Sequence, residues 1–348
     1  MPSEIVDDAT GLTAEWLSSV LGAEVRSVAV EPVGTGQMAS CYRLSVEYER
    51  GDGPTRLIAK LPSHDPSTRA QAALPYRAEV GFYRDLAPRL DVDAPRCWFA
   101  EVADDGTSFT LLLEDMAPAT AGDQITGCSP DQARAAAVAV AALHAGSWCD
   151  PSSSAYEWLV PPMGQMADLV AAVLGDGIDL FLSKRTFDPA HADVLRRFAD
   201  GFTSWALARA DTWSLVHNDY RLDNLLFAPE GSDLPPVTTV DWQSVSTGLP
   251  LRDVAFLVGT GLEPDARKAH EHAIVGAYHQ ALVARGIEGY GAEQCWDDYR
   301  LGLFQAPFIC IVAEAMAAPT ERGLQMFSLM AERSTTAILE LGALDLLD

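Results

Sequence analysis

One short polar segment, residues 217–224, contains the side chains of this chain best suited to chemistry. His217, Asp219 and Asn224 have the spacing His-x-Asp-x-x-x-x-Asn, and Asp241 follows further along the chain. Phosphoryl transfer needs a carboxylate to receive a hydroxyl proton, and an amide and a second carboxylate to bind Mg²⁺. The alternative is a turn without catalytic function, since Asp and Asn side chains often hydrogen-bond to the local backbone.

The residues around this segment predict how it is held. Leu215-Val216 and Leu225–Phe227 are apolar and predict two short buried strands, with the polar centre as the loop between them. The apolar run Val237–Val240 predicts another strand that ends at Asp241. Buried flanks of this kind would keep the carboxylate and the amide of the loop at a fixed separation.

The segment resembles the catalytic and metal-binding segments of the protein-kinase-like superfamily. It is most similar to the small-molecule branch, the aminoglycoside phosphotransferase and choline-kinase-like family. Asn218 stands where these enzymes usually have Gly, and Trp242-Gln243 replaces the Phe-Gly of protein kinases. That replacement argues against a protein kinase with a regulated Phe-Gly switch, and Asp-Trp-Gln resembles the ecdysteroid-kinase-like branch.

Upstream residues match the nucleotide-binding half of such enzymes. Gly34, Gly36 and Ser40 lie in a strand–turn–strand pattern, and glycines let a backbone approach phosphates closely. A plain hairpin turn is the alternative. Lys60, in the apolar run Arg56–Pro62, resembles the lysine that neutralises the α- and β-phosphates. A lysine that reaches water from a half-buried strand is the alternative there.

Two further segments continue this order. Glu79 lies beside Val80 and Tyr83, which recur at helical spacing, and it matches the family's lysine-orienting glutamate. A solvated helix glutamate is the alternative. The apolar run 109–113 ends at Glu114 and resembles the hinge strand, so backbone groups from Glu114 to Met116 would bind adenine. A plain core strand would have the same pattern.

The resemblance implies a function for each residue of the polar segment. Asp219 would orient the acceptor hydroxyl and accept its proton, His217 would brace the loop, and Asn224 with Asp241 would ligate Mg²⁺. Asp253 matches a family aspartate that accepts backbone N–H groups of the catalytic loop. The alternative for Asp253 is an ordinary first-turn acid favoured by the helix dipole. The implied cofactors are ATP and Mg²⁺.

Length and composition agree with the resemblance. A chain of 348 residues exceeds what one core usually supports, and 48% hydrophobic residues suffice for packed interiors. We expect an α+β, two-lobed protein-kinase-like fold. Residues 1–115 would form a small antiparallel sheet with one helix that binds nucleotide, and residues 116–348 a mainly helical lobe with the acceptor site.

Several cellular properties follow from the same composition. No apolar run has the length of a membrane span, the N-terminus lacks a signal-peptide pattern, and the six cysteines are scattered. We therefore expect a cytoplasmic protein, monomeric or homodimeric, without a membrane partner. The cysteines read as reduced core residues and form no zinc pattern.

Charge gives a hint about the acceptor. The formal net charge of −25 disfavours nucleic acid and favours a cationic small molecule, such as an aminoglycoside- or choline-like alcohol. Candidate carboxylates for it are Glu293, Asp297 and Glu314, although solvent or a structural arginine is an alternative partner for Glu314. An acidic surface that only aids solubility would have the same net charge.

Three alternatives to a kinase of cationic acceptors remain open from the sequence. A kinase of a neutral alcohol (a sugar, a steroid or a macrolide-like compound) would share every motif. A nucleotide-binding pseudokinase would share most of them. A helical interaction protein with a fortuitous loop would lack nucleotide binding.

Hydrophobic periodicity predicts the remaining elements. Strands are expected at 29–31, 39–48, 55–61, 96–102 and 108–113, with loops at 61–68 and at the Gly175–Gly177 break. Helices are expected at 14–21, 76–88, 130–144, 164–174, 189–210, 251–260, 264–285, 292–318 and 320–346. Thr10 or Thr13 should cap the first helix and Gly22 end it, and Ser129 should cap the helix that follows it.

Overall fold

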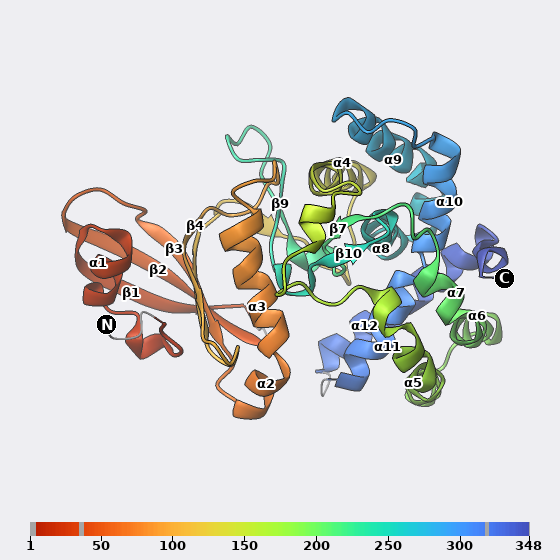
Figure 1. The fold of residues 1–348 in the computed structure, drawn as a ribbon, viewed down its shortest axis with the longest axis horizontal. Helices are drawn as coiled ribbons and strands as arrows, with labels where there is room; N and C mark the ends of the chain where they lie inside the picture. The colour runs from red at the N-terminus through yellow and green to blue at the C-terminus, as the bar shows by residue number, and fades with distance from the viewer. Residues whose placement is uncertain (1–4, 35–37, 317–319, 348) are drawn as a thin grey trace. The chain divides into compact units, whose positions relative to one another are not determined.

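The computed structural model describes residues 5–34, 38–316 and 320–347 (Figure 1). The chain forms two compact units. Unit 1 comprises Met1–Ala119, Glu157–Val160 and Thr238–Val245, and unit 2 comprises Thr120–Tyr156, Pro161–Val237 and Ser246–Asp348. The division into residues 1–115 and 116–348 stays a prediction. It differs from these units in that it assigns Glu157–Val160 and Thr238–Val245 to the second lobe.

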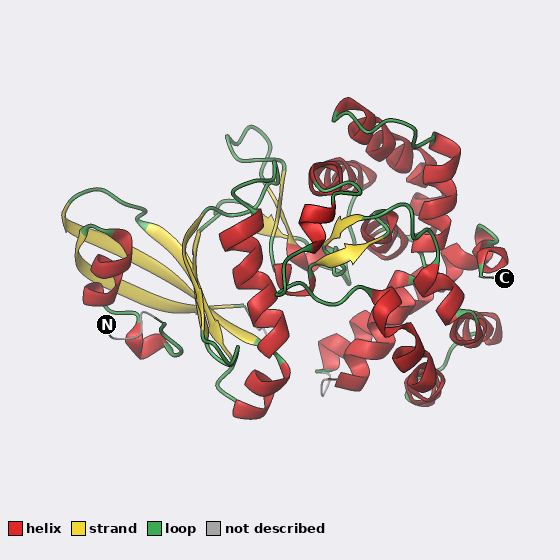
Figure 2. Ribbon diagram, in the orientation of Figure 1, coloured by secondary structure: helices red, strands yellow, loops and turns green. Residues whose placement is uncertain are grey.

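Unit 1 is built on an antiparallel sheet (Figure 2). Its strands have the order β1-β2-β3-β5-β4. They are β1 (Glu24–Val33), β2 (Ala39–Arg50), β3 (Arg56–Pro62), β4 (Cys97–Val102) and β5 (Phe109–Glu114). The predicted strands are confirmed, and β1 is longer than the expected 29–31.

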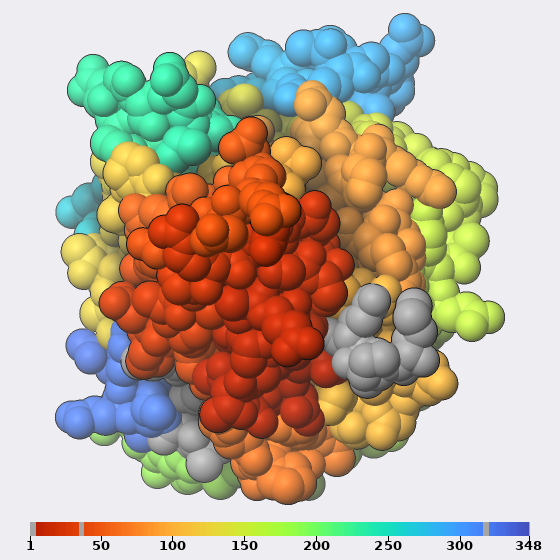
Figure 3. Space-filling view, turned by 90° about the vertical axis from the view of Figure 1, so that its left-hand side faces the viewer, coloured from red at the N-terminus to blue at the C-terminus, as the bar shows by residue number. Residues whose placement is uncertain are grey.

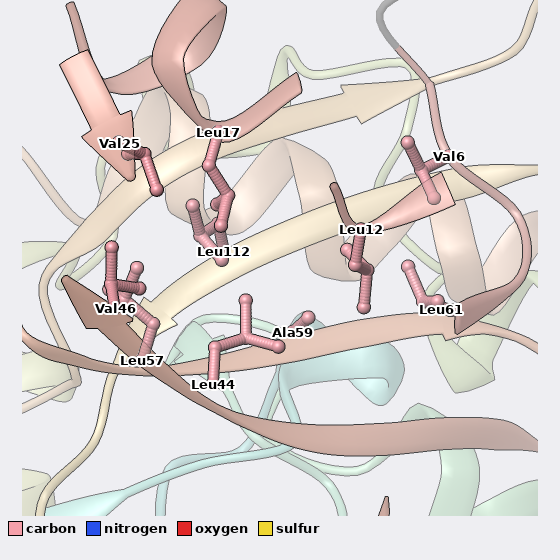
Figure 4. Close-up of a cluster of buried hydrophobic side chains, with 10 residues drawn as sticks. All are labelled: Val6, Leu12, Leu17, Val25, Leu44, Val46, Leu57, Ala59, Leu61 and Leu112. Carbon is pink, nitrogen blue, oxygen red and sulfur yellow. The ribbon is translucent and has the colours of Figure 1, made fainter. Parts of the chain in front are cut away.

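The core of unit 1 lies between this sheet and the helix α1 (Ala14–Leu21) (Figure 4). Leu17 from the helix and Leu44, Leu57 and Leu112 from three strands are fully buried there. Thr13 caps α1 through a hydrogen bond from the Trp16 N–H group, and Gly22 ends it in the left-handed conformation. The predicted bounds of this helix and its stop at Gly22 are confirmed. Figure 3 shows the described N-terminal residues of unit 1, in red and orange, gathered on one face of that unit.

The single long helical segment predicted at 76–88 is α3 (Ala73–Gly81) followed by a π-helical turn, Phe82–Leu86. Gly81 packs against the indole of Trp158, because a Cβ atom at this position would lie 2.2 Å from the ring. The Trp158 Nε1–H group donates to Asp85 at 2.8 Å. These contacts attach the segment Glu157–Val160 to unit 1.

Unit 2 is mainly helical and also contains several short strands. The strand β7 (Ser214–Val216) pairs with β10 (Ser246–Gly248), and β6 (Thr120–Ala121) pairs with β8 (Leu225–Phe227). Every residue of α8 (Leu251–Gly261) is buried, so this helix lies at the centre of the unit. The other helices are α4 (Pro130–Gly146), α5 (Met163–Ser183), α6 (Pro189–Asp200), α7 (Phe202–Leu207), α9 (Pro264–Ala284), α10 (Ala292–Gly302), α11 (Gln305–Met316) and α12 (Glu321–Glu340).

Several predicted boundaries were wrong. The helix α5 continues through Gly175 and Gly177, where a break was expected. Two helical glycines cost roughly 1 kcal/mol each, but Leu174, Ile178 and Phe181 of α5 are buried, and Gly177 lets the helix approach Ile311. The segments 189–210 and 292–318 each contain two helices, and the predicted loop at 61–68 includes the start of α2 (Pro66–Gln71).

The predicted cap of α4 is confirmed. Ser129 and Gln132 form a reciprocal capping box, which satisfies two backbone N–H groups at the start of this helix. Within the described part of the chain, none of the helices is both long enough and apolar enough to cross a membrane.

Candidate active site

Three charged residues that are far apart in the sequence meet in unit 1. The Lys60 Nζ atom lies 2.7 Å from Glu79 Oε2 and 2.7 Å from Asp241 Oδ1. The side chain of Glu79 is 2% exposed, whereas that of Asp241 is 26% exposed. The lysine therefore joins a buried carboxylate to one that solvent, and hence a ligand, can reach.

Regular elements hold this group in place. Lys60 lies on β3 between β2 and β5, Glu79 lies on α3, and Asp241 follows β9 (Val237–Thr239). Asp241 has a left-handed backbone, with φ of 66°, which is uncommon for a residue other than Gly and typical of functional positions.

An aromatic stack links the helix to the Asp241 segment. The rings of Phe82 and Trp242 lie 3.7 Å apart between centroids and are nearly parallel, at 7°. Both side chains are buried, and Trp242 Nε1–H also donates to the Thr239 carbonyl at 3.2 Å. Phe82 follows Glu79 by one helical turn and Trp242 is adjacent to Asp241, so the stack fixes both carboxylates near the lysine.

The two carboxylates stabilise the charge on Lys60, whereas burial disfavours the charge on Glu79. Burial opposes the charge on Lys60, but Asp241 and Glu79 outweigh it and raise the Lys60 pKa well above its ordinary value. Burial raises the pKa of the Glu79 carboxyl to about 7, although Lys60 acts in the opposite direction. Cys41 faces Lys60 from β2, and burial raises the pKa of its thiol to about 11. Lys60 is thus a stable cation beside a neutral thiol.

The polar segment of unit 2 follows β7, as the apolar flanks predicted. Asp219 accepts a hydrogen bond from the Asn224 Nδ2 group at 2.8 Å on Oδ2, and its own carbonyl accepts another from the same group. The Asp219 N–H group donates to Nδ1 of the buried His217 at 3.3 Å. The structure therefore brings together the His, Asp and Asn of the motif.

Asp253, at the start of α8, lies beneath this segment. Its carboxylate accepts the N–H groups of His217 at 2.6 Å and Asn218 at 2.8 Å, and it faces His144 Nε2 at 3.2 Å. Asn218 has a left-handed φ of 65°, a conformation that Gly adopts freely and Asn tolerates better than most residues. This explains how Asn can replace the usual glycine here.

We expect Asp253→Ala to destabilise unit 2 by about 3 kcal/mol, because it leaves the buried N–H group of His217 and the partly buried N–H group of Asn218 without their acceptor. The midpoint of urea unfolding measures this effect. The matched control is Asp265→Ala, which removes an exposed acid from the first turn of α9. A first-turn acid alone contributes roughly 0.3–1 kcal/mol, so equal small losses in both variants would contradict the anchoring by Asp253.

Three charged residues around Asp219 were not predicted from the sequence as part of the site. Arg221 Nε lies 3.0 Å from Asp219 Oδ1, and Arg221 Nη1 lies 2.5 Å from Asp223 Oδ2. Arg322, near the start of α12, pairs with the same Asp223 carboxylate at 3.0 Å. Arg221 and Asp223 could have been noticed because they lie within the motif, but no sequence pattern indicates that Arg322 of α12 lies next to Asp223.

The remaining nucleotide-binding candidates lie around the sheet of unit 1. Gly34 follows β1 with φ of 75°, a left-handed conformation that favours glycine. Ser40 lies on β2 opposite Leu61, Glu114 ends β5 exposed to solvent, and Met116 is buried. Gly36 lies outside the described residues.

The acids proposed to bind a cationic acceptor are not gathered at one point. Glu314, on α11, pairs with Arg185 and with Lys184 at 3.0 Å, so its partners are structural cations. Burial opposes the Glu314 charge, but hydrogen bonds from Arg185 and Lys184 outweigh it and lower the pKa of this carboxyl.

The other two acids lie on α10. Glu293 and Asp297 line a groove of about 510 Å³ between α9 and α10, and Asp297 also pairs with Arg300 at 3.0 Å. None of the residues that line this groove belongs to the segment 217–224.

Solved structures of other proteins have a similar fold. A solved structure of a proposed aminoglycoside phosphotransferase from Ralstonia eutropha is 19% identical, with a TM-score of 0.58, covering 96% of this chain and 98% of that one. Choline kinase from Cryptosporidium parvum is 10% identical, with a TM-score of 0.58 and 91% coverage of both chains. The GDP complex of aminoglycoside 2′-phosphotransferase-IIIa is 16% identical, with a TM-score of 0.56, covering 91% and 96%. At these identities the similarity concerns the fold, which is the protein-kinase-like fold expected from the sequence.

Sequence comparisons identify the family. A stretch of 50 residues is 42% identical to acyl-CoA dehydrogenase family member 10 of Mus musculus, and it spans 14% of this chain but 4% of that protein. The model of the ecdysteroid kinase-like family matches residues 34–286, from the Gly turn to the end of α9. This protein belongs to the ecdysteroid kinase-like family.

Proposed function

We propose that this protein transfers the γ-phosphoryl group of Mg-ATP to a hydroxyl group of a neutral small molecule. The observation that carries the proposal is the ion pairing of Lys60 with both Glu79 and Asp241. A lysine held by a buried glutamate beside a solvent-accessible aspartate suits a site for nucleotide phosphates and their cation. The partly exposed Asp219 and the buried Asn224 of the loop 217–224 would supply the remaining chemistry.

Each residue has a defined role in this proposal. Lys60, oriented by Glu79, binds the α- and β-phosphates, and backbone groups near Glu114 hold the adenine ring. Asp219 orients the acceptor hydroxyl and receives its proton, while Asn224 fixes the position of the Asp219 carboxylate. Most of the rate gain comes from stabilising charge on the transferred group, so residues that hold phosphates and cation should matter most.

The donor groups fit Mg²⁺. In nucleotide sites Mg²⁺ takes one or two carboxylates or amides from the protein and completes its shell with phosphate oxygens and water. Asp241 and Asn224 offer such oxygens, and among the described residues no three His, Cys, Asp or Glu side chains form a closed metal site. When bound, Mg²⁺ would neutralise charge on the phosphates.

The ion pairs near the catalytic segment favour a neutral acceptor over a cationic one. Arg221 forms an ion pair with Asp219, and Arg322 forms one with the neighbouring Asp223. Glu314 is already paired with two cations. An incoming ammonium group would meet these arginines and would find Glu314 engaged. The description of the family as ecdysteroid kinase-like supports a steroid-like alcohol as the first class to test.

An ADP-release screen tests this proposal, with Asp219→Asn as the blank. The panel should contain steroid, sugar and macrolide-like alcohols, aminoglycosides and choline-like alcohols. We expect the best acceptor to be neutral, and its kcat/KM to change less than about twofold between low and physiological salt, since screening acts on charged substrates. A cationic best acceptor whose kcat/KM falls steeply with salt and with Glu293→Gln would reject the neutral class but leave the kinase assignment intact.

A further inference from the structure

The guanidinium group of Arg221 contacts the carboxylate that the proposed reaction uses, so this contact must change during the reaction. Its Nε atom lies 3.0 Å from Oδ1 and 3.3 Å from Oδ2 of Asp219, the carboxylate proposed to receive the hydroxyl proton. Oδ2 also accepts the Asn224 amide at 2.8 Å. An acceptor hydroxyl that approaches Asp219 must therefore share these oxygens with, or displace, the guanidinium group.

The second partner of Arg221 is firmly anchored. Asp223 Oδ2 lies 2.5 Å from Arg221 Nη1, while Asp223 Oδ1 accepts the Gln124 N–H group at 3.0 Å. Arg322 binds both oxygens of Asp223, at 3.0 and 3.1 Å. The contacts with Gln124 and Arg322 hold Asp223 in place independently of Arg221, so Asp223 can still bind Arg221 when the contact of Arg221 with Asp219 is lost.

We propose that Arg221 is a catalytic residue that binds the transferring phosphoryl group, an inference that rests on the proposed function. When the acceptor hydroxyl takes its place on Asp219, the guanidinium turns about its contact with Asp223 and donates N–H groups to the phosphoryl oxygens. A guanidinium presents its donors in a planar fork that matches such oxygens, and it stays charged at any pH of interest.

The step is balanced without any further reactant. A bond forms between the acceptor oxygen and the γ-phosphorus, and the bond from that phosphorus to the bridging oxygen of ADP breaks. The hydroxyl proton passes to Asp219, and nothing is oxidised or reduced. During the transfer, negative charge is spread over the phosphoryl oxygens, and an arginine that meets them there lowers the barrier.

Chemical rescue tests this proposal most sharply. We expect Arg221→Ala to lower kcat by about 100-fold or more, since arginines in such positions contribute large factors, while the KM values for ATP and acceptor change less than about threefold. Added guanidinium, below unfolding concentrations, should restore at least about tenfold of the lost kcat, because the site retains Asp223. Arg221→Lys should fall between the wild type and the alanine variant.

Two further variants separate catalysis from folding and from surface charge. Arg134→Gln removes an exposed arginine from α4 of the same unit and should leave kcat unchanged. Asp223→Asn should weaken the contact that holds Arg221 and so lower kcat about tenfold, with the KM for ATP unchanged. Circular dichroism of each variant verifies that unit 2 is folded.

Defined outcomes overturn the inference. A kcat of Arg221→Ala within about threefold of the wild type, or a loss that guanidinium does not restore in a folded variant, would exclude the catalytic role. If Asp219→Asn is inactive while Arg221→Ala is fully active, only this inference fails. If the wild type transfers no phosphoryl group to any acceptor, the proposed function itself fails.

Discussion

Replacing Asp241 with asparagine is expected to lower turnover by about 1,000-fold or more and to weaken Mg-nucleotide binding. Asparagine has nearly the shape of aspartate, and it tolerates the left-handed backbone at this position. It removes the negative charge that pairs with Lys60 at 2.7 Å and, in our proposal, binds Mg²⁺. Loss of electrostatic groups at a phosphoryl-transfer site typically has effects of this size.

Steady-state kinetics and a titration of nucleotide with and without Mg²⁺ measure both effects. The matched control is Asp233→Asn, which removes an exposed carboxylate from the loop that precedes β9. This control should behave as the wild type. If Asp241→Asn kept more than about a tenth of the wild-type kcat and an unchanged Mg²⁺ requirement, Asp241 would not be the metal ligand.

Replacing Asp219 with asparagine should also lower turnover by about 1,000-fold, within the range for loss of a positioned acid–base group. In contrast to Asp241→Asn, it should leave the affinity for Mg-ATP within about twofold of the wild type, because the proposed partner of Asp219 is the acceptor. An asparagine can still contact Asn224 and Arg221, so the loop should keep its structure.

The contrast between the two variants is the informative result. Both are near-isosteric, and each removes one negative charge from a position next to a cation. An equal loss of nucleotide affinity in the two folded variants would contradict the separate roles proposed for Asp219 and Asp241.

The sequence was sufficient for the parts of the site that depend on local patterns. The apolar flanks of residues 217–224 form strands, as predicted, because short apolar runs next to a polar loop favour a buried or half-buried strand. Lys60 and Glu79 meet although they lie on separate elements. The order of motifs along the chain was enough to predict that contact through the family resemblance.

Other features depend on packing between elements, which local patterns do not encode. The partners of Glu314 come from the end of α5, where a break at Gly175–Gly177 had been expected to end the helix early. The stack of Phe82 on Trp242 joins residues from distant parts of the chain. Arg322 reaches Asp223 from α12. Net charge does not encode such local placements either, since Arg221 and Arg322 lie on Asp219 and Asp223 in a chain of formal charge −25.

Phosphorus NMR of the complete reaction tests the central claim most directly. Wild-type protein, Mg-ATP and the best acceptor of the screen should convert the γ-phosphate signal of ATP into that of a phosphomonoester, with ADP formed in equal amount. Omission of Mg²⁺, Asp241→Asn and Asp219→Asn should each abolish this signal. If ADP and inorganic phosphate appeared without a phosphomonoester for every acceptor class, or if both variants matched the wild type, the account would be contradicted.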